Sequence, residues 1–235
     1  MIDYAILTTA LKMVEVTLPS WSGSEKLPDL SYLYLFPIDG YDVGVFYKER
    51  DDLVTERSPF YLAIVIVPRY SLLDFFRCIK GIIKRVLRLK TKDAAIAADI
   101  NLLSAAMLKN FSAAECWVVG YSSAGSVAEL LRDRLATKGG EWKSFSIGGF
   151  PVFRGKEDED RRCRFLITRK LDFVSAFPWD VVRRDAAQGV RVVTMWDEDP
   201  VFTEGGMRMI FPFSFLNPLF LIESIKAHYS YRRIQ

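Results

Sequence analysis

The residues from Ala114 to Leu131 constrain the fold of this chain more than any other stretch. They begin with a short apolar run, Cys116 to Val119, which is typical of a buried parallel strand. They end with a helical pattern from Ser126 onward, and only a few residues are left for the turn between the two. A strand, a sharp turn and a helix in direct succession predict an α/β sheet with helices packed on it.

The turn offers a serine in a restricted setting. Ser122 has Gly120 two positions before it and Ala124 two positions after it. Larger side chains at those two places would collide with the neighbouring backbone, so the spacing favours Ser122 as a nucleophile presented on a tight turn. The alternative, Ser123, would put the bulky Tyr121 at the first of these places. From these residues alone, serines that simply cap the helix remain an equal alternative.

Length and composition predict one globular domain over residues 1–235. Half of the residues are hydrophobic and about a quarter are charged, with a net charge of +3. That charge is too small to indicate nucleic-acid binding. Cys78, Cys116 and Cys163 lack the spacing of metal ligands, and two of them, Cys116 and Cys163, fall in apparent buried strands. We therefore expect reduced core thiols and no metal site.

The ends of the chain carry no clear targeting signal. The N-terminal residues include Asp3 and no basic leader, which makes a poor signal peptide. The apolar stretch from Met209 to Ile222 contains two prolines and is too short to span a bilayer. We expect an intracellular, cytoplasmic protein that could lie peripherally on membranes.

The remaining pattern predicts a mainly parallel sheet. A hairpin is expected near the N-terminus, and strands then alternate with helices, as in parallel α/β architectures. The hairpin strands are Tyr32–Phe36 and Asp42–Tyr47, and a strand covered on both faces is Tyr61–Val67. Helices are expected at Tyr4–Val16, Leu72–Leu89 and Ala94–Asn110, and further strands at Lys143–Ile147, Arg164–Thr168 and Val190–Trp196.

A serine nucleophile needs a base, which is usually a histidine oriented by a carboxylate. His228 is the only histidine in the chain, and it lies beyond the last predicted strand, where a loop would carry it. Asp172 follows the end of the Arg164–Thr168 strand, which is a favourable place for a catalytic carboxylate. Its rivals, which we disfavour, are Asp180, Asp197, Glu198 and Asp199.

These segments resemble the class 3, or fungal-type triacylglycerol, lipases. VVGYSSAGSVAELL resembles the Gly-His-Ser-Leu-Gly-Gly turn of that family, with Tyr121 in place of His and Ala124 in place of Gly. SIGGFPVF, DFVSAFP and AHYSY resemble, in the family's order, its Phe-Gly-x-Pro-Arg-Val, Asp-x-Val-Pro-x-Leu-Pro and His-x-x-Tyr segments. IVIVPRYSLLDFF has the pattern of the family's upstream strand, turn and helix but lacks its Arg-Gly-Thr.

The resemblance implies an α/β-hydrolase fold, with a mainly parallel central sheet flanked by helices and an N-terminal β-hairpin. It also implies a catalytic triad of Ser122, Asp172 and His228. The backbone N–H of Ser123 is the natural first oxyanion donor. The second donor should come from the turn after Pro68, where the candidates are Arg69, Tyr70 and Ser71.

Two further segments could contact the substrate or its surroundings. Arg77 to Lys92 is basic and amphipathic, so it could touch an anionic membrane, although a packed helix with a solvated basic face explains it at least as well. It falls within residues 72–111, which we expect to supply lid or surface helices. An acyl groove could be lined by Tyr121 and by part of an aromatic cluster before His228, namely Phe213, Phe215 and Leu216, and core packing is the alternative.

The sequence thus predicts a serine-dependent ester hydrolase for acyl lipids, lipase-like or phospholipase-like, that needs no cofactor. The substituted turn and the missing Arg-Gly-Thr leave a second hypothesis, a weak or inactive lipase-like module that binds lipid or protein. Hydrolysis of a thioester or an amide is a third, because the same triad would serve it.

Overall fold

The computed structural model describes the parts of the chain that form the sheet, its packed helices and the elements near Ser122. These are residues 10, 13–14, 31–47, 61–69, 76–77, 80–81, 84, 92–108, 115–137, 141–149, 163–169, 172, 191–195, 202–204 and 217–229.

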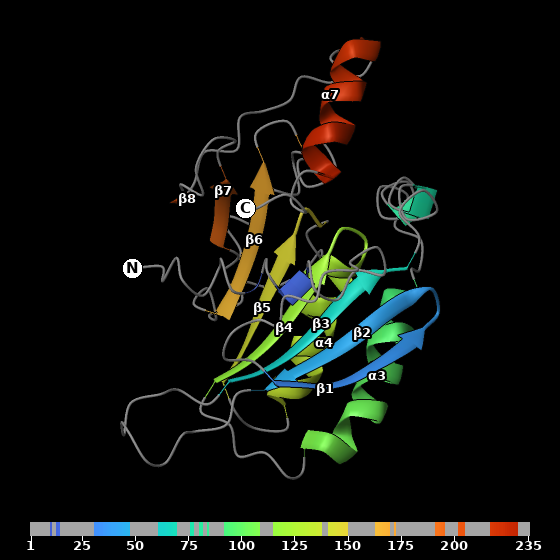
Figure 1. The fold of residues 1–235 in the computed structure, drawn as a ribbon, viewed down its shortest axis with the longest axis vertical. Coiled ribbons are helices and arrows are strands. Elements are labelled where there is room, and N and C mark those ends of the chain that lie inside the picture. The colour runs from blue at the N-terminus through green and yellow to red at the C-terminus, as the bar shows by residue number, and fades with distance from the viewer. Residues whose placement is uncertain are drawn as a thin grey trace.

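A mixed sheet of eight strands, arranged in chain order, organises these residues (Figure 1). The first two strands form the antiparallel hairpin, β1 (Ser31–Ile38) and β2 (Tyr41–Tyr47), and β2 pairs antiparallel with β3. Five strands then run parallel: β3 (Tyr61–Pro68), β4 (Glu115–Tyr121), β5 (Trp142–Ile147), β6 (Arg164–Arg169) and β7 (Arg191–Met195). The short β8 (Phe202–Glu204) closes the far edge antiparallel to β7.

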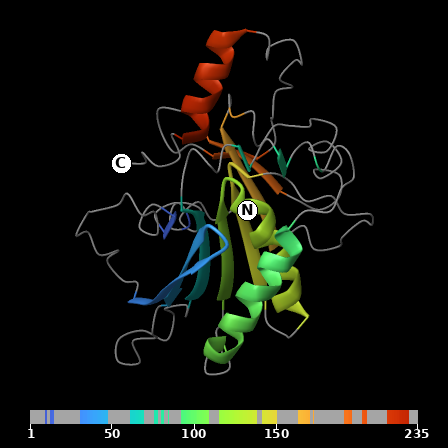
Figure 2. The ribbon, with the colours of Figure 1, turned by 90° about the vertical axis from the view of Figure 1, so that its right-hand side faces the viewer.

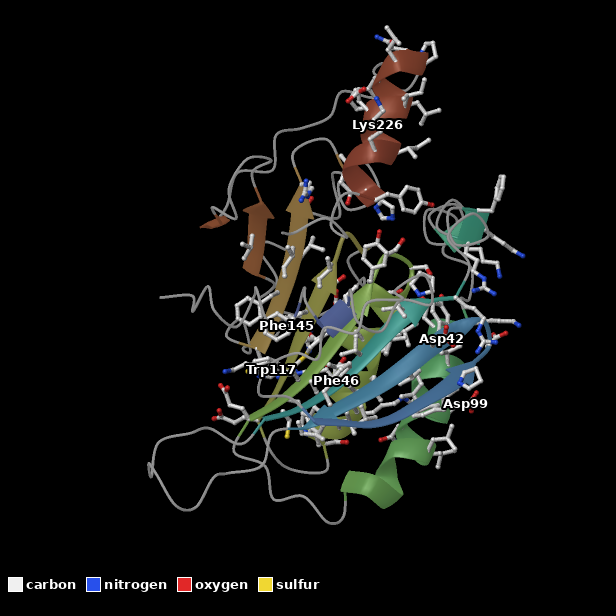
Figure 3. The ribbon with its side chains drawn as sticks, viewed as in Figure 1. Asp42, Phe46, Asp99, Trp117, Phe145 and Lys226 are labelled. Carbon is white, nitrogen blue, oxygen red and sulfur yellow. The ribbon has the colours of Figure 1, made fainter. Side chains whose placement is uncertain are left out.

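Alternate residues of each central strand face opposite cores, because successive side chains of a strand point to opposite sides of the sheet. In β3, Ala63, Val65 and Val67 lie in one core, while Leu62, Ile64 and Ile66 lie in the other. The first core is rich in aromatic rings, and Figure 3 shows Phe46, Trp117 and Phe145 along the middle of the sheet. Phe145 stacks on Phe165 at 5.0 Å and meets Trp117 edge-on at 5.8 Å.

The second core is covered by two packed helices, α3 (Asp93–Leu108) and α4 (Ala124–Ala136), which lie on the same side of the sheet (Figure 2). Ile96, Ala97 and Ile100 of α3 are buried in this core together with Val127 and Leu131 of α4. Helix α3 falls within residues 72–111, which we expect to supply lid or surface helices. One face of α3 packs on the sheet, while Leu102 and Leu103 are exposed, and a lid role stays a prediction.

Helix α7 (Pro218–Tyr229) stands beyond the carboxyl ends of the parallel strands in both ribbon views (Figures 1 and 2). Figure 3 shows Lys226 on this helix, well away from the aromatic core. None of the helices in the described residues is long and apolar enough to cross a bilayer.

The architecture confirms the predicted mainly parallel sheet, the N-terminal hairpin and the Ala94–Asn110 helix. Two elements were not predicted, β8 and α7. The prolines of the Met209–Ile222 stretch argue against a long helix, but Pro218 begins α7, because proline also suits the first helical position. The Tyr4–Val16 and Leu72–Leu89 predictions fall largely outside the described residues, although residues 10, 13, 14, 76, 77, 80, 81 and 84 are helical.

The cysteines differ in their exposure. Cys116 is buried in β4, as expected, and burial together with the negative charge of Glu115 raises the pKa of its thiol to about 11. Cys163 is half-buried and directly precedes β6, so its assignment to a buried strand is wrong. Cys78 lies outside the described residues.

We expect the two thiols to react at different rates with a thiol reagent such as DTNB at pH 8. About one thousandth of the Cys116 thiol would be ionised at that pH, and the sulfur is also shielded from solvent. In a Cys78→Ser background, Cys163 should therefore react first and Cys116 only after denaturant is added. Rapid modification of Cys116 in the native protein would contradict this placement.

Candidate active site

The turn between β4 and α4 holds Ser122 in a backbone conformation that few residues adopt. Its φ angle is +55°, in the left-handed region, where the backbone conformation of any residue other than glycine is unfavourable by about 1 kcal/mol or more. Two hydrogen bonds fix this geometry: the Ser122 N–H donates to Ile147 O of β5 at 2.9 Å, and the Gly125 N–H donates to Ser122 O at 3.0 Å. Strained residues of this kind, held by their surroundings, occur mainly at functional sites.

The small residues around Ser122 are required by close packing. A Cβ atom at Gly120 would collide with the backbone of Ala124 and would lie 2.8 Å from the Ala128 Cβ. Gly125 has its Cα so close to Gly149 that a Cβ there would lie 2.9 Å from the Gly149 Cα. The steric reasoning that singled out Gly120 from the sequence is therefore confirmed for this turn.

A continuous hydrogen-bonded series joins Ser122, His228 and Asp172. The Ser122 Oγ lies 2.6 Å from the Nε2 of His228, and the His228 Nδ1 lies 3.0 Å from the Oδ1 of Asp172. All three side chains are buried. An ionised carboxylate can only accept a hydrogen bond, so pairing with Asp172 fixes the proton on Nδ1 and leaves Nε2 of a neutral ring to accept the Ser122 hydroxyl proton.

Three separate elements bring these groups together at the carboxyl edge of the sheet. Ser122 follows β4, Asp172 follows β6 with its N–H donating to Arg169 O at 3.1 Å, and His228 comes from α7. The prediction of a loop for His228 is wrong, because the histidine lies in the last turn of a helix. The pattern of residues 218–229 could have indicated this helix, since it ends in Lys226 and His228, which suit a helix C-terminus.

Tyr121 supports His228 from the core side of the site. It is fully buried, its hydroxyl donates to the backbone carbonyl of His228 at 3.0 Å, and the two rings stack with centroids 5.9 Å apart. Carbonyls in the last turn of a helix have no partner within the helix, and this hydroxyl provides one. We expect Tyr121 to line the substrate groove, and this stays a prediction: the structure shows the residue fully buried and in contact with His228.

Ser123, the alternative nucleophile, has a different environment. It is the N-cap residue of α4, with a φ of −59°, and its Oγ lies 3.0 Å from the hydroxyl of Tyr41. Of these two neighbouring serines, Ser122 is therefore the one whose hydroxyl contacts Nε2 of His228, as the spacing of small residues suggested. The contact with Tyr41 was not foreseen, because it depends on the hairpin register that sets Tyr41 opposite Pro68 at the same sheet edge.

Arg69 is the one candidate for the second oxyanion donor that the structure describes in the turn after β3. The backbone N–H of Arg69 donates to Gly40 O at 3.0 Å, and its guanidinium pairs with Asp42 at 2.7 Å (Figure 3 labels Asp42). These contacts argue against Arg69 as the second donor. Tyr70 and Ser71 lie outside the described residues, as do the groove candidates Phe213, Phe215 and Leu216.

Among the comparisons with known proteins, the structural one supports the fold. In sequence, the chain matches no protein-family model and no curated protein. In structure, it is similar to the Lip2 lipase of Yarrowia lipolytica, with a TM-score of 0.60 and 15% identity over 97% of this chain and 93% of that one. It is also similar to the triacylglyceride lipase of Rhizomucor miehei, with a TM-score of 0.56 and 15% identity over 98% and 94%. The chain therefore has the α/β-hydrolase fold of these lipases.

The packing around Gly120 predicts a large effect for a single methyl group. Gly120→Ala should lower the free energy of unfolding by about 1 to 3 kcal/mol, because the new Cβ would push against the Ala124 backbone and force the turn to shift. Urea denaturation would measure the change. A variant as stable as the parent chain would show that the turn is not closely packed.

The Tyr121 hydroxyl should also contribute measurably to stability. Tyr121→Phe keeps the ring stacking but leaves a helix-end carbonyl without its partner, so we expect a loss of about 1 to 3 kcal/mol in unfolding free energy. Tyr121→Leu, which removes the stacking as well, should cost more. If the two variants were equally stable, the ring contact with His228 would be unimportant.

Proposed function

We propose that this chain is a serine-dependent carboxylic ester hydrolase that acts on acyl lipids through Ser122, His228 and Asp172. One observation carries the proposal: a serine in a strained left-handed turn lies 2.6 Å from the only histidine of the chain, which a buried carboxylate holds from its other side. An ordinary helix-capping serine needs neither the strain nor the histidine.

The contacts support an acyl-enzyme mechanism. The Ser122 Oγ would attack the ester carbonyl carbon while His228 Nε2 takes the hydroxyl proton, and Asp172 would stabilise the imidazolium that forms. His228 would then return that proton to the departing alkoxide, which leaves as an alcohol. Water, deprotonated by the same nitrogen, would release the carboxylic acid and restore Ser122.

The charge that develops on the carbonyl oxygen would be stabilised at the N-terminus of α4. The Ser123 N–H is the natural first donor, since Ser123 follows the nucleophile and begins a helix whose dipole favours negative charge there. The Arg69 contacts favour Tyr70 or Ser71 for the second donor. Loss of one such donor costs a factor of about 100 to 1000 in kcat.

An acyl lipid as substrate is supported by exposed apolar side chains, two of them on the helix that carries His228. The helix that carries His228 exposes two large apolar side chains, Leu219 and Ile222, and Phe76 is exposed on the segment after β3. Ser122 itself is fully buried, so an ester can reach its Oγ only when part of the covering structure moves. The Rhizomucor miehei protein with a similar fold is a triacylglyceride lipase, which agrees with this class of substrate.

The proposal predicts that two neighbouring serines differ sharply in function. Ser122→Ala should lower kcat for p-nitrophenyl butyrate by a factor of at least about 1000, because the nucleophile is lost. Ser123→Ala removes only the hydroxyl that contacts Tyr41 and keeps the backbone donor, so it should retain most of the activity. Spectrophotometric assays of p-nitrophenol release by both variants and the parent chain would measure kcat, and circular dichroism would verify folding.

Equal rates for Ser122→Ala and the parent chain would rule out the proposed nucleophile. A well-folded parent chain with no hydrolysis of any ester, thioester or amide in a substrate panel would instead support the alternative of a non-catalytic lipase-like module.

A further inference from the structure

A pocket of about 240 Å³ opens next to the Ser122 turn and is separate from the three hydrogen-bonded groups. Ser123 and Ser126 at the start of α4 form one side of it, and Tyr41 of the hairpin forms another. The volume is below the range of about 300 to 1000 Å³ that is usual for whole drug-sized ligands, so it suits a small polar group better than an entire lipid.

The pocket has an excess of positive charge. Its lining includes four cationic residues, Arg77, Lys80, Lys84 and Lys92, and two carboxylates, Asp39 and Asp93. Both carboxylates have partners: Asp39 lies 3.7 Å from Lys92, and Asp93 accepts from the Ser126 hydroxyl at 2.9 Å. Within the described part of the chain, no carboxylate comes within ion-pair distance of Arg77, Lys80 or Lys84.

The three remaining cations share one side of a helical segment. Their spacing of three and four residues places them on the same face, where like charges destabilise a helix unless an anion lies between them. Arg77 is held in position, since its guanidinium donates to Gly40 O at 3.1 Å and lies 5.5 Å above the Tyr41 ring. The basic face therefore points at least partly into the pocket and not only toward solvent.

We infer that this basic pocket, defined by Arg77, Lys80, Lys84 and Lys92, binds the phosphate-bearing headgroup of the acyl-ester substrate. The inference rests on the proposed ester hydrolase and narrows its substrate to phosphorylated acyl glycerols. A phosphate in the pocket would lie beside Ser123, one residue from the nucleophile, near the positive end of α4. The acyl chains would then extend toward the exposed apolar residues of α7, Leu219 and Ile222.

Two matched, monomeric substrates test the inference without a membrane surface: dihexanoyl phosphatidic acid and dihexanoyl glycerol, which carry the same esters. The parent chain should show a higher kcat/KM for the phosphorylated ester. The double variant Lys80→Gln, Lys84→Gln should reduce the ratio of the two kcat/KM values at least about tenfold, because charge-assisted contacts to the phosphate are lost. Raising the salt concentration should reduce the same ratio in the parent chain.

Arg134→Gln is the matched control. Arg134 is an exposed cation of α4 near the helix end opposite Ser122, and the pocket does not include it. The control should keep the parent ratio. Any of three results would overturn the inference. The parent chain could show no preference for the phosphorylated ester, the lysine variant could keep the parent ratio of kcat/KM values, or it could lose kcat/KM equally on both substrates.

Two further measurements separate the sources of the signal. Calorimetric titration should show that glycerol 3-phosphate binds to the parent chain and not to the lysine variant. Inorganic phosphate should bind to the parent chain more weakly. If glycerol 3-phosphate does not bind to the parent chain, the inference is overturned even if esters are hydrolysed. If no ester is hydrolysed, the proposed function fails while the titration still tests the pocket. The second measurement is sedimentation with phosphatidylglycerol vesicles. If the chain binds the vesicles through the lysines but shows no preference between the monomeric esters, the basic residues contact a membrane surface, and the headgroup assignment is overturned.

Discussion

The left-handed backbone at Ser122 is the constraint on which the rest of the site depends. It ends β4 and starts α4 within two residues, and it turns the serine hydroxyl toward the carboxyl edge of the sheet. The strain is sustained by the hydrogen bond to β5 and by the absence of a side chain at Gly120. Because Oγ is fixed in this way, His228 can reach it from 106 residues further along the chain.

Local sequence could predict this turn, the parallel strands and the choice of Ser122, because each depends on residues close together in the chain. His228 could be named by elimination, since the chain has one histidine, whereas Asp172 was favoured over its rivals because it follows a buried strand. Local sequence could not predict the helix around His228, the contact of Tyr121 with that helix, or the contacts of Arg69, because these depend on packing between distant segments.

The surroundings of the site combine two kinds of surface at one sheet edge. Exposed apolar residues lie on the helix that carries His228, and a basic pocket borders the serine turn. An amphipathic ester would satisfy both, with its acyl chains on the apolar side and its charged group in the pocket. A substrate without a charged group would leave the repulsion among Arg77, Lys80 and Lys84 uncompensated.

The central claim is that Ser122 is a nucleophile activated by His228. Peptide mass spectrometry after treatment with a fluorophosphonate tests it most directly, since the reagent bonds covalently only to an activated serine. The account predicts one adduct per chain, on the peptide that contains Ser122, and its loss in a folded His228→Ala variant. An adduct on Ser123, or labelling of Ser122 that persists without the histidine, would contradict it.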